Sequence, residues 1–126
     1  MQGDAQPLWE PAQDRVEQTT LYAFMRAMEE RWDETFIDFS AFWRWTVEED
    51  EKFWLSLWDY CDVVAEKRGE RIVEHKHRMP GARWFPDARL SYPENLLRRR
   101  DDAVAMVFWG EDQVRRELTF NEVYDQ

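Results

Sequence analysis

The chain has 126 residues, enough for one domain of ordinary size, and 44% of them are hydrophobic, which excludes wholesale disorder. Its formal charge of −10 disfavours binding to nucleic acid or to an anionic membrane surface. Aromatic residues make up 16% of the chain, but four glycines leave little material for the loops that hold nucleotide phosphates. We therefore do not expect a self-contained nucleotide enzyme.

Cysteine and histidine are too few for a disulfide framework or a zinc site. The single cysteine, Cys61, cannot form an internal disulfide, and two histidines do not suffice for a zinc cage. The first eleven residues are polar and acidic, and no run approaches the ~20 apolar residues of a membrane span. These features predict a cytoplasmic protein without a membrane partner.

Charge is distributed unevenly along the chain. Residues 1–60 hold five basic and fourteen acidic side chains, whereas residues 66–100 hold ten basic and five acidic ones. The basic stretch includes Arg98, Arg99 and Arg100, and its simplest interpretation is a solvated helix end whose cations complement the helix dipole. A surface for an acidic partner or a phosphate is the alternative interpretation.

The N-terminal residues predict an arm followed by a helix. Residues 1–18 contain glycine and proline and predict an extended arm that presents Leu8 and Trp9 for docking. Apolar residues recur at helical spacing after Thr19 or Thr20, either of which is a suitable N-cap. This pattern predicts an amphipathic helix.

Two more helices are expected before residue 62. Residues 38–45 predict a short helix, and Thr46 with Glu49 has the spacing of a capping box that opens another. That third helix carries an apolar stripe: Phe53, Trp54, Leu57, Trp58 and Cys61. We interpret the stripe as core or interface packing, not as a sugar-binding or cofactor-binding platform. Cys61 is expected to be a buried apolar residue, because no recognisable catalytic histidine and acid accompany it.

The middle of the chain predicts a short edge strand. Residues 63–80 alternate weakly between polar and apolar around Gly69. His75 and His77 would lie on one face of that strand. A His-x-His pair without a third ligand is weak support for a metal site, so we expect none.

The C-terminal half predicts two helices and a β-hairpin. Ser91 and Thr119 each precede a glutamate by three residues and predict helix starts, the first helix running to the arginines. Between them lie an apolar run at residues 103–109, a turn signal at residues 110–112 and a returning segment at residues 113–118.

This set of elements gives no complete layer, because two strands expose a face that nothing else in the chain covers. We therefore expect the front end of a longer protein. The chain contains none of the common phosphate-binding, dinucleotide-binding, hydrolase or zinc-protease motifs. The 27 acidic residues offer no basis for choosing a catalytic acid or base. The sequence nominates no catalytic, cofactor-binding or metal-binding residue.

One segment resembles a known family. Residues 79–97, MPGARWFPDARLSYPENLL, resemble the pattern M-P-G-A-x-W-F-P-G-A-x-L-N-Y-A-E-N-L-L of the acetoacetyl-CoA synthetases, which are adenylate-forming acyl-CoA synthetases. We call residues 79–97 the signature segment. Asp87, Ser91 and Pro93 depart from the family's usual glycine, asparagine and alanine. Flanking motifs agree in order: Leu8 with Trp9, Phe53 with Trp54, residues 58–60, residues 107–111 and residues 115–120.

The resemblance implies an α+β fragment of such an enzyme, with a mainly α N-terminal extension, a β-hairpin and the start of a helix. The expected parts are an extended arm at 1–18, a helical acetyl-CoA synthetase-type domain at 19–100, and the opening of the AMP-binding large domain at 101–126.

For the parent enzyme, the resemblance implies ATP, Mg²⁺ and CoA as cofactors and a small carboxylic acid, acetoacetate by preference, as substrate. The family's ATP motifs lie beyond this chain, so we expect no cofactor and no activity in the chain alone. Its expected partner is the remainder of the enzyme. A free-standing tryptophan-rich interaction module without enzymatic activity is the alternative.

Overall fold

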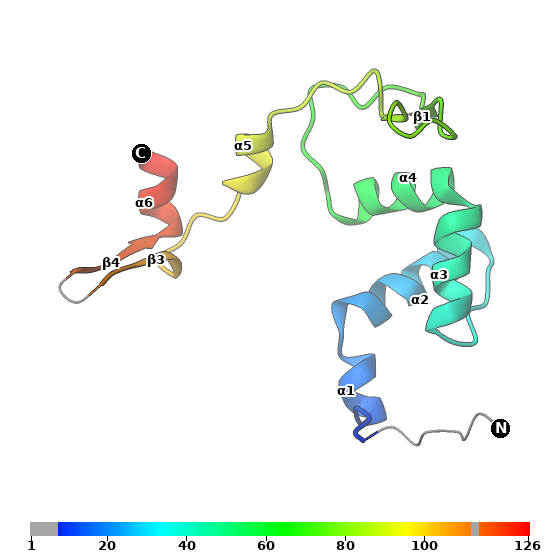
Figure 1. The fold of residues 1–126 in the computed structure, drawn as a ribbon, viewed down its shortest axis with the longest axis horizontal. Helices are drawn as coiled ribbons and strands as arrows, with labels where there is room; N and C mark the ends of the chain where they lie inside the picture. The colour runs from blue at the N-terminus through cyan, green and yellow to red at the C-terminus, as the bar shows by residue number, and fades with distance from the viewer. Residues whose placement is uncertain (1–7, 112–113) are drawn as a thin grey trace. The chain divides into compact units, whose positions relative to one another are not determined.

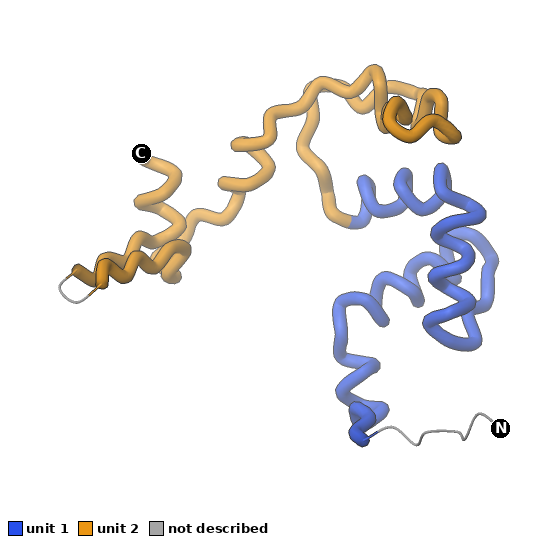
Figure 2. The backbone as a smooth tube through the Cα atoms, in the orientation of Figure 1, with its two compact units in different colours: residues 1–60 blue, residues 61–126 orange. Residues whose placement is uncertain are grey.

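The computed structural model describes residues 8–111 and 114–126 (Figure 1). The chain divides into two compact units, residues 1–60 and residues 61–126 (Figure 2). Helices dominate, and two small antiparallel sheets accompany them, which confirms the predicted fold class. The domain boundary at residue 100 that the family resemblance implies stays a prediction.

The described part of the first unit contains four helices: α1 (Gln13–Glu17), α2 (Thr20–Trp32), α3 (Phe39–Glu48) and α4 (Asp50–Tyr60). Helix α1 lies inside the stretch predicted as an extended arm, so that prediction is wrong for residues 13–17. A side-chain hydrogen bond stabilises this short helix: the Gln13 amide donates to the Glu17 carboxylate at 2.8 Å. Leu8 and Trp9 remain exposed ahead of it.

Helix α2 begins at its predicted cap, and α3 begins within the stretch predicted as a helix, with Asp38 as its cap. The Thr19 hydroxyl accepts from the backbone N–H of Tyr22 at 3.2 Å, and the Asp38 carboxylate accepts from that of Ala41 at 2.7 Å. Each bond satisfies one backbone donor that the first helical turn leaves unpaired. Helix α2 ends at Trp32, and the C-cap residue Asp33 adopts a left-handed φ of 54°.

The predicted capping box at Thr46 is wrong. Thr46 lies within α3, and its hydroxyl donates to the carbonyl of Trp43 at 2.7 Å. A threonine that bonds backward in this way occupies a helix interior and does not open a new helix. Helix α4 begins four residues later, at Asp50.

The core of the first unit is an aromatic and methionine cluster from α2, α3 and the loop between them. Its buried members are Phe24, Met25, Met28, Phe36, Phe42 and Trp45. Phe36 is fixed from the loop, because its backbone N–H donates to the Glu29 carboxylate at 2.7 Å. Ser56 of α4 is 0% exposed and accepts from the indole N–H of Trp32 at 2.8 Å.

The apolar stripe of α4 is confirmed only in part. Phe53 and Leu57 pack against the core cluster. Cys61 is exposed, so the prediction of a buried cysteine is wrong. Helix α4 ends at Tyr60 and Asp62 takes a left-handed φ of 51°, so the helical spacing that would bury Cys61 no longer applies.

The second unit begins with long loops around a minimal sheet. Its elements are β1 (Val73–Glu74), β2 (Arg83–Trp84), α5 (Tyr92–Leu96), β3 (Val104–Gly110), β4 (Val114–Thr119) and α6 (Phe120–Asp125). The predicted strand within residues 63–80 is reduced to β1, which pairs antiparallel with β2. His75 follows with a φ of 54°, so the two histidines do not share a strand face as predicted.

The β-hairpin and its following helix are confirmed. Strands β3 and β4 pair antiparallel, with Val107 opposite Glu117 and Phe108 opposite Arg116. Part of the predicted turn, residue 112, lies outside the described residues. The capping box of α6 is complete: the Thr119 hydroxyl accepts from the Glu122 N–H at 3.2 Å, and the Glu122 carboxylate accepts from the Thr119 N–H at 2.8 Å.

Within residues 8–111 and 114–126, no helix has both the length and the apolar character needed to cross a membrane.

Candidate docking surfaces and the signature segment

Four charged side chains hold the signature segment against β1. Arg71 donates two hydrogen bonds to the Asp87 carboxylate, at 2.8 Å from Nε and 2.6 Å from Nη2. Arg71 also pairs with Glu74, which in turn accepts from Arg83 at 3.3 Å. The hydrogen bonds from Arg71 lower the pKa of Asp87 and keep it ionised. This cluster orders a loop, and the lowered pKa of Asp87 does not suit a general acid.

Asp87 stands at a close approach of two backbone segments. Gly69 has a left-handed φ of 83°, and a Cβ there would lie 2.6 Å from the Cβ of Asp87. Glycine is therefore required at position 69 both by conformation and by space. The pattern that the signature segment resembles has glycine at position 87, where Asp87 here adds a bidentate bond to Arg71.

Asn95 links helix α5 to the chain that follows α4. Its side-chain carbonyl accepts from the Val64 N–H at 2.8 Å, and its amide donates to the Val64 carbonyl at 2.8 Å. The same amide donates to the Ser91 carbonyl at 2.9 Å. The amide group thus pairs with the Val64 backbone much as a neighbouring strand would.

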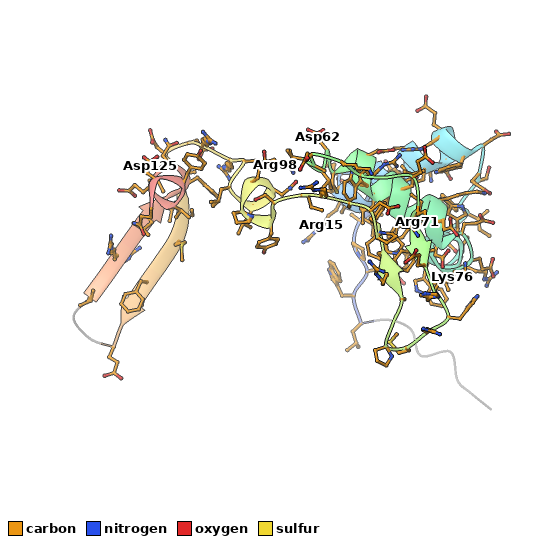
Figure 3. All side chains as sticks on the ribbon, turned by 90° about the horizontal axis from the view of Figure 1, so that it is seen from above. Arg15, Asp62, Arg71, Lys76, Arg98 and Asp125 are labelled. Carbon is orange, nitrogen blue, oxygen red and sulfur yellow. The ribbon has the colours of Figure 1, made fainter. Side chains whose placement is uncertain are left out.

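The three arginines are not a solvated helix end, because α5 stops at Leu96. Arg98, labelled in Figure 3, donates to the carbonyls of Asp62 at 2.6 Å and Cys61 at 3.2 Å. Arg99 bonds to Asp101 at 2.7 Å, which lowers the pKa of Asp101, and Arg100 lies 3.5 Å from the ring centroid of Tyr124. These intramolecular contacts disfavour a phosphate site formed by Arg98, Arg99 and Arg100.

No group of three metal-binding side chains occurs among the described residues. The sequence analysis predicted that this chain supplies no catalytic, cofactor-binding or metal-binding residue, and this stays a prediction. What the structure does present on both units is exposed apolar surface.

The first such surface is one face of the β-hairpin. A hollow of about 400 Å³ lies over the strands and is lined by Met106, Val107, Phe108, Val114, Arg116 and Leu118. Met106, Phe108 and Val114 are exposed although they are large and apolar. Contiguous apolar surface of this kind is typical of a face that another part of a protein covers.

The second surface is a groove on the helical unit. Its volume is about 300 Å³ and its lining is almost entirely apolar: Leu21, Phe24, Phe39, Phe42, Trp43, Thr46, Phe53 and Leu57. Phe39 and Trp43 are exposed at its rim, while Phe42 belongs to the core. The groove therefore joins buried core residues to exposed apolar ones, and such a surface is suited to packing against another apolar surface.

Comparison with known proteins shows that the chain is similar to part of several acyl-CoA synthetases. Residues 39–96 match a family model described as "Acetyl-coenzyme A synthetase N-terminus". The chain is 40% identical over 117 residues to the acetoacetyl-coenzyme A synthetase of Rhizobium meliloti (strain 1021). The aligned region covers 93% of this chain and 18% of that protein. It is 27% identical over 125 residues to the acetoacetyl-CoA synthetase of Danio rerio, covering 95% of this chain and 18% of that protein.

A solved structure agrees. The acetoacetyl-CoA synthetase from Streptomyces lividans matches with a TM-score of 0.81 and 31% identity, covering 91% of this chain and 18% of that one. The chain thus spans 18% of the length of each of these relatives. The resemblance first detected in the signature segment is confirmed: the chain is similar to the N-terminal region of acetoacetyl-CoA synthetases.

Proposed function

We propose that this chain, which is similar to the N-terminal region of acetoacetyl-CoA synthetases, is the N-terminal structural segment of an acetoacetate-CoA ligase. The observation that carries the proposal is the match to 93% of this chain but only 18% of the Rhizobium meliloti enzyme. The exposed apolar surfaces support it, since both the hairpin face and the helical groove are suited to packing against a larger body.

The parent enzyme would join acetoacetate to CoA in two steps. The acetoacetate carboxylate attacks the α-phosphorus of ATP, which gives acetoacetyl-adenylate and releases pyrophosphate. The CoA thiol then loses its proton and attacks the acyl carbon, which gives acetoacetyl-CoA and releases AMP. Mg²⁺ would accompany ATP in the first step by neutralising phosphate charge.

We assign neither step to the residues of this chain. The described residues contain no set of three metal-binding side chains, and the three consecutive arginines are engaged by groups of their own unit. The role proposed for the chain is therefore positional: it supplies a folded helical unit and a hairpin that pack on the remainder of the enzyme. The chain alone is expected to be inactive.

A cytoplasmic location is part of the proposal. It is supported by the cysteine content, since one cysteine in 126 residues gives no internal disulfide of the kind that secreted domains of this size use.

The test is a ligation assay on the protein encoded by the reading frame that contains this chain. We expect the frame to continue past Gln126 and the purified product to form AMP when acetoacetate, ATP, Mg²⁺ and CoA are all present. Acetate and propionate serve as competing acids, and faster turnover with either would reject the acetoacetate assignment. A stop codon directly after Gln126, with a partner protein bound to the exposed tryptophans, would instead support the free-standing interaction module.

A further inference from the structure

Residues 85–88 of the signature segment form a tight turn, which we call the signature turn. The Ala88 N–H closes it by donating to the Phe85 carbonyl at 2.9 Å. The Phe85 N–H donates to the Ile72 carbonyl at 2.7 Å, which ties the start of the turn to the chain just before β1. The exchange of these two amides therefore reports whether the turn is formed.

Phe85 has a backbone conformation that bulky residues avoid. Its φ is 44°, in the left-handed region. Large side chains at positive φ are outliers, and they persist only where the surrounding structure holds them. Pro86 follows, and a residue before proline favours an extended backbone. The signature turn therefore needs contacts outside its own four residues to keep this shape.

Position 87 decides which kind of turn can form. Proline followed by glycine is typical of a type II turn, in which the residue after proline has a positive φ. The pattern that the signature segment resembles has this pair of residues. Here Asp87 follows Pro86, and Asp87 is not among the described residues that have a positive φ. The turn is therefore not of type II, and a negative φ at Asp87 is compatible with type I.

The Asp87 side chain makes the contacts that the turn needs. Its carboxylate accepts two hydrogen bonds from Arg71, at 2.8 Å and 2.6 Å, and Arg71 also pairs with Glu74 of β1. A Cβ at position 69 would lie 2.6 Å from the Asp87 Cβ, but 3.5 Å from the nearest backbone atoms of Asp87. The side chain of Asp87, and not its backbone, thus excludes a Cβ at position 69.

We propose that Asp87 is the positioning residue of the signature turn. Its carboxylate binds Arg71 and so holds Phe85 in the left-handed conformation. Its Cβ leaves room only for glycine at position 69, so the residues at positions 69, 71 and 87 act as one coupled unit. A glycine at position 87 makes neither contact. The inference does not depend on ligase activity, so it stands or falls separately from the proposed function.

A double-mutant cycle tests the coupling between positions 69 and 87. The full 126-residue chain is compared with Gly69→Ala, Asp87→Gly and the double variant, through the protection factors of the Phe85 and Ala88 amides. Gly69→Ala always adds a left-handed alanine, but it adds a clash only where Asp87 is present. We expect Gly69→Ala to lower the protection factors at least about tenfold more with Asp87 than with glycine at position 87. Equal effects in the two backgrounds would overturn the inference.

Asp87→Asn is the matched control, because asparagine keeps the Cβ and loses the charge. Gly69→Ala is expected to lower the protection factors as strongly in Asp87→Asn as in the unaltered chain. An effect as small as the one with glycine at position 87 would overturn the inference, because the Cβ contact would then not cause the coupling.

The backbone conformation of Phe85 tests the Arg71 contact separately from stability. At positive φ the amide and α protons of one residue lie close together, so the nuclear Overhauser effect between them is strong. We expect a strong effect for Phe85 in the unaltered chain and a weaker one in Arg71→Gln and Asp87→Asn, while amide protection in β3 and β4 stays unchanged. An unchanged effect in both variants would overturn the role assigned to Asp87. This measurement needs no change at position 69, so it decides the matter where Gly69→Ala fails to fold.

Discussion

Replacement of Phe42 by alanine tests whether the aromatic cluster stabilises the first unit. The Phe42 side chain is 4% exposed, and its ring centroid lies 5.2 Å from that of Phe36 and 6.0 Å from those of Phe24 and Trp45. Truncation of a buried phenylalanine to alanine destabilises a protein by about 3–5 kcal/mol. A unit of 60 residues has a free energy of unfolding of about 3–9 kcal/mol, at roughly 0.05–0.15 kcal/mol per residue. Phe42→Ala is therefore expected to unfold a large fraction of the first unit.

Phe39→Ala is the matched control, three residues earlier on the same helix. The Phe39 side chain is 56% exposed, so its loss is expected to lower the free energy of unfolding by about 1 kcal/mol or less. Urea unfolding followed by helical circular dichroism and tryptophan fluorescence measures both variants. Equal free energies of unfolding for Phe42→Ala and Phe39→Ala would refute the assignment of the core.

Three further predictions concern single contacts. Ser56→Ala leaves the Trp32 indole N–H without its buried acceptor, and we expect it to reduce the free energy of urea unfolding by about 1–3 kcal/mol; no change would show that the bond contributes nothing. Because Arg71 lowers the folded-state pKa of Asp87, the stabilisation from this pair is complete above the ordinary carboxyl pKa and is lost as pH falls through the lowered one. Protection factors of the amides in residues 71–87, which correct for the slower intrinsic exchange in acid, are therefore expected to fall on acidification, and Asp87→Asn is expected to remove that fall, which its persistence would contradict. Thr119→Ala removes the N-cap of α6 at a cost of about 1 kcal/mol, seen as faster amide exchange in that helix, and unchanged exchange would argue against the cap.

Helix starts were predictable where a side-chain oxygen precedes a helical pattern. Thr19, Ser91 and Thr119 each accept a backbone N–H bond as expected. The same rule fails at Thr46, because a threonine hydroxyl that follows residues already in a helix bonds backward, here to Trp43. Local spacing alone does not show whether the preceding turn is helical.

The segment between helix α4 and strand β3 was the least predictable from the sequence. Residues 61–100 contain few regular elements, and bonds between residues far apart in sequence hold them. Asn95 pairs with the backbone of Val64, and Arg98 binds the carbonyl of Asp62. Such contacts have no periodicity, so patterns of apolar residues do not reveal them.

The hairpin was predictable as a pair of strands, and its exposed face was expected as well, because no other predicted element covers it. An unbroken apolar run indicates a strand in covered surroundings, and β3 has that run. Whether the run is covered depends on which other strands are present, and within the described residues only β4 pairs with it. The signature segment supplied what the local patterns did not, namely the family that the chain resembles.

Acetoacetate-dependent exchange of labelled pyrophosphate into ATP tests whether this chain is a structural segment of an acetoacetate-CoA ligase. The assay reports reversible formation of acetoacetyl-adenylate without requiring CoA. We expect the longer protein encoded by the same reading frame to exchange pyrophosphate into ATP and the 126-residue chain not to do so. The reason is that the chain is proposed as a structural segment, with the active site in the remainder of the enzyme. Robust exchange by the 126-residue chain, or no exchange by the longer protein, would contradict the proposed function.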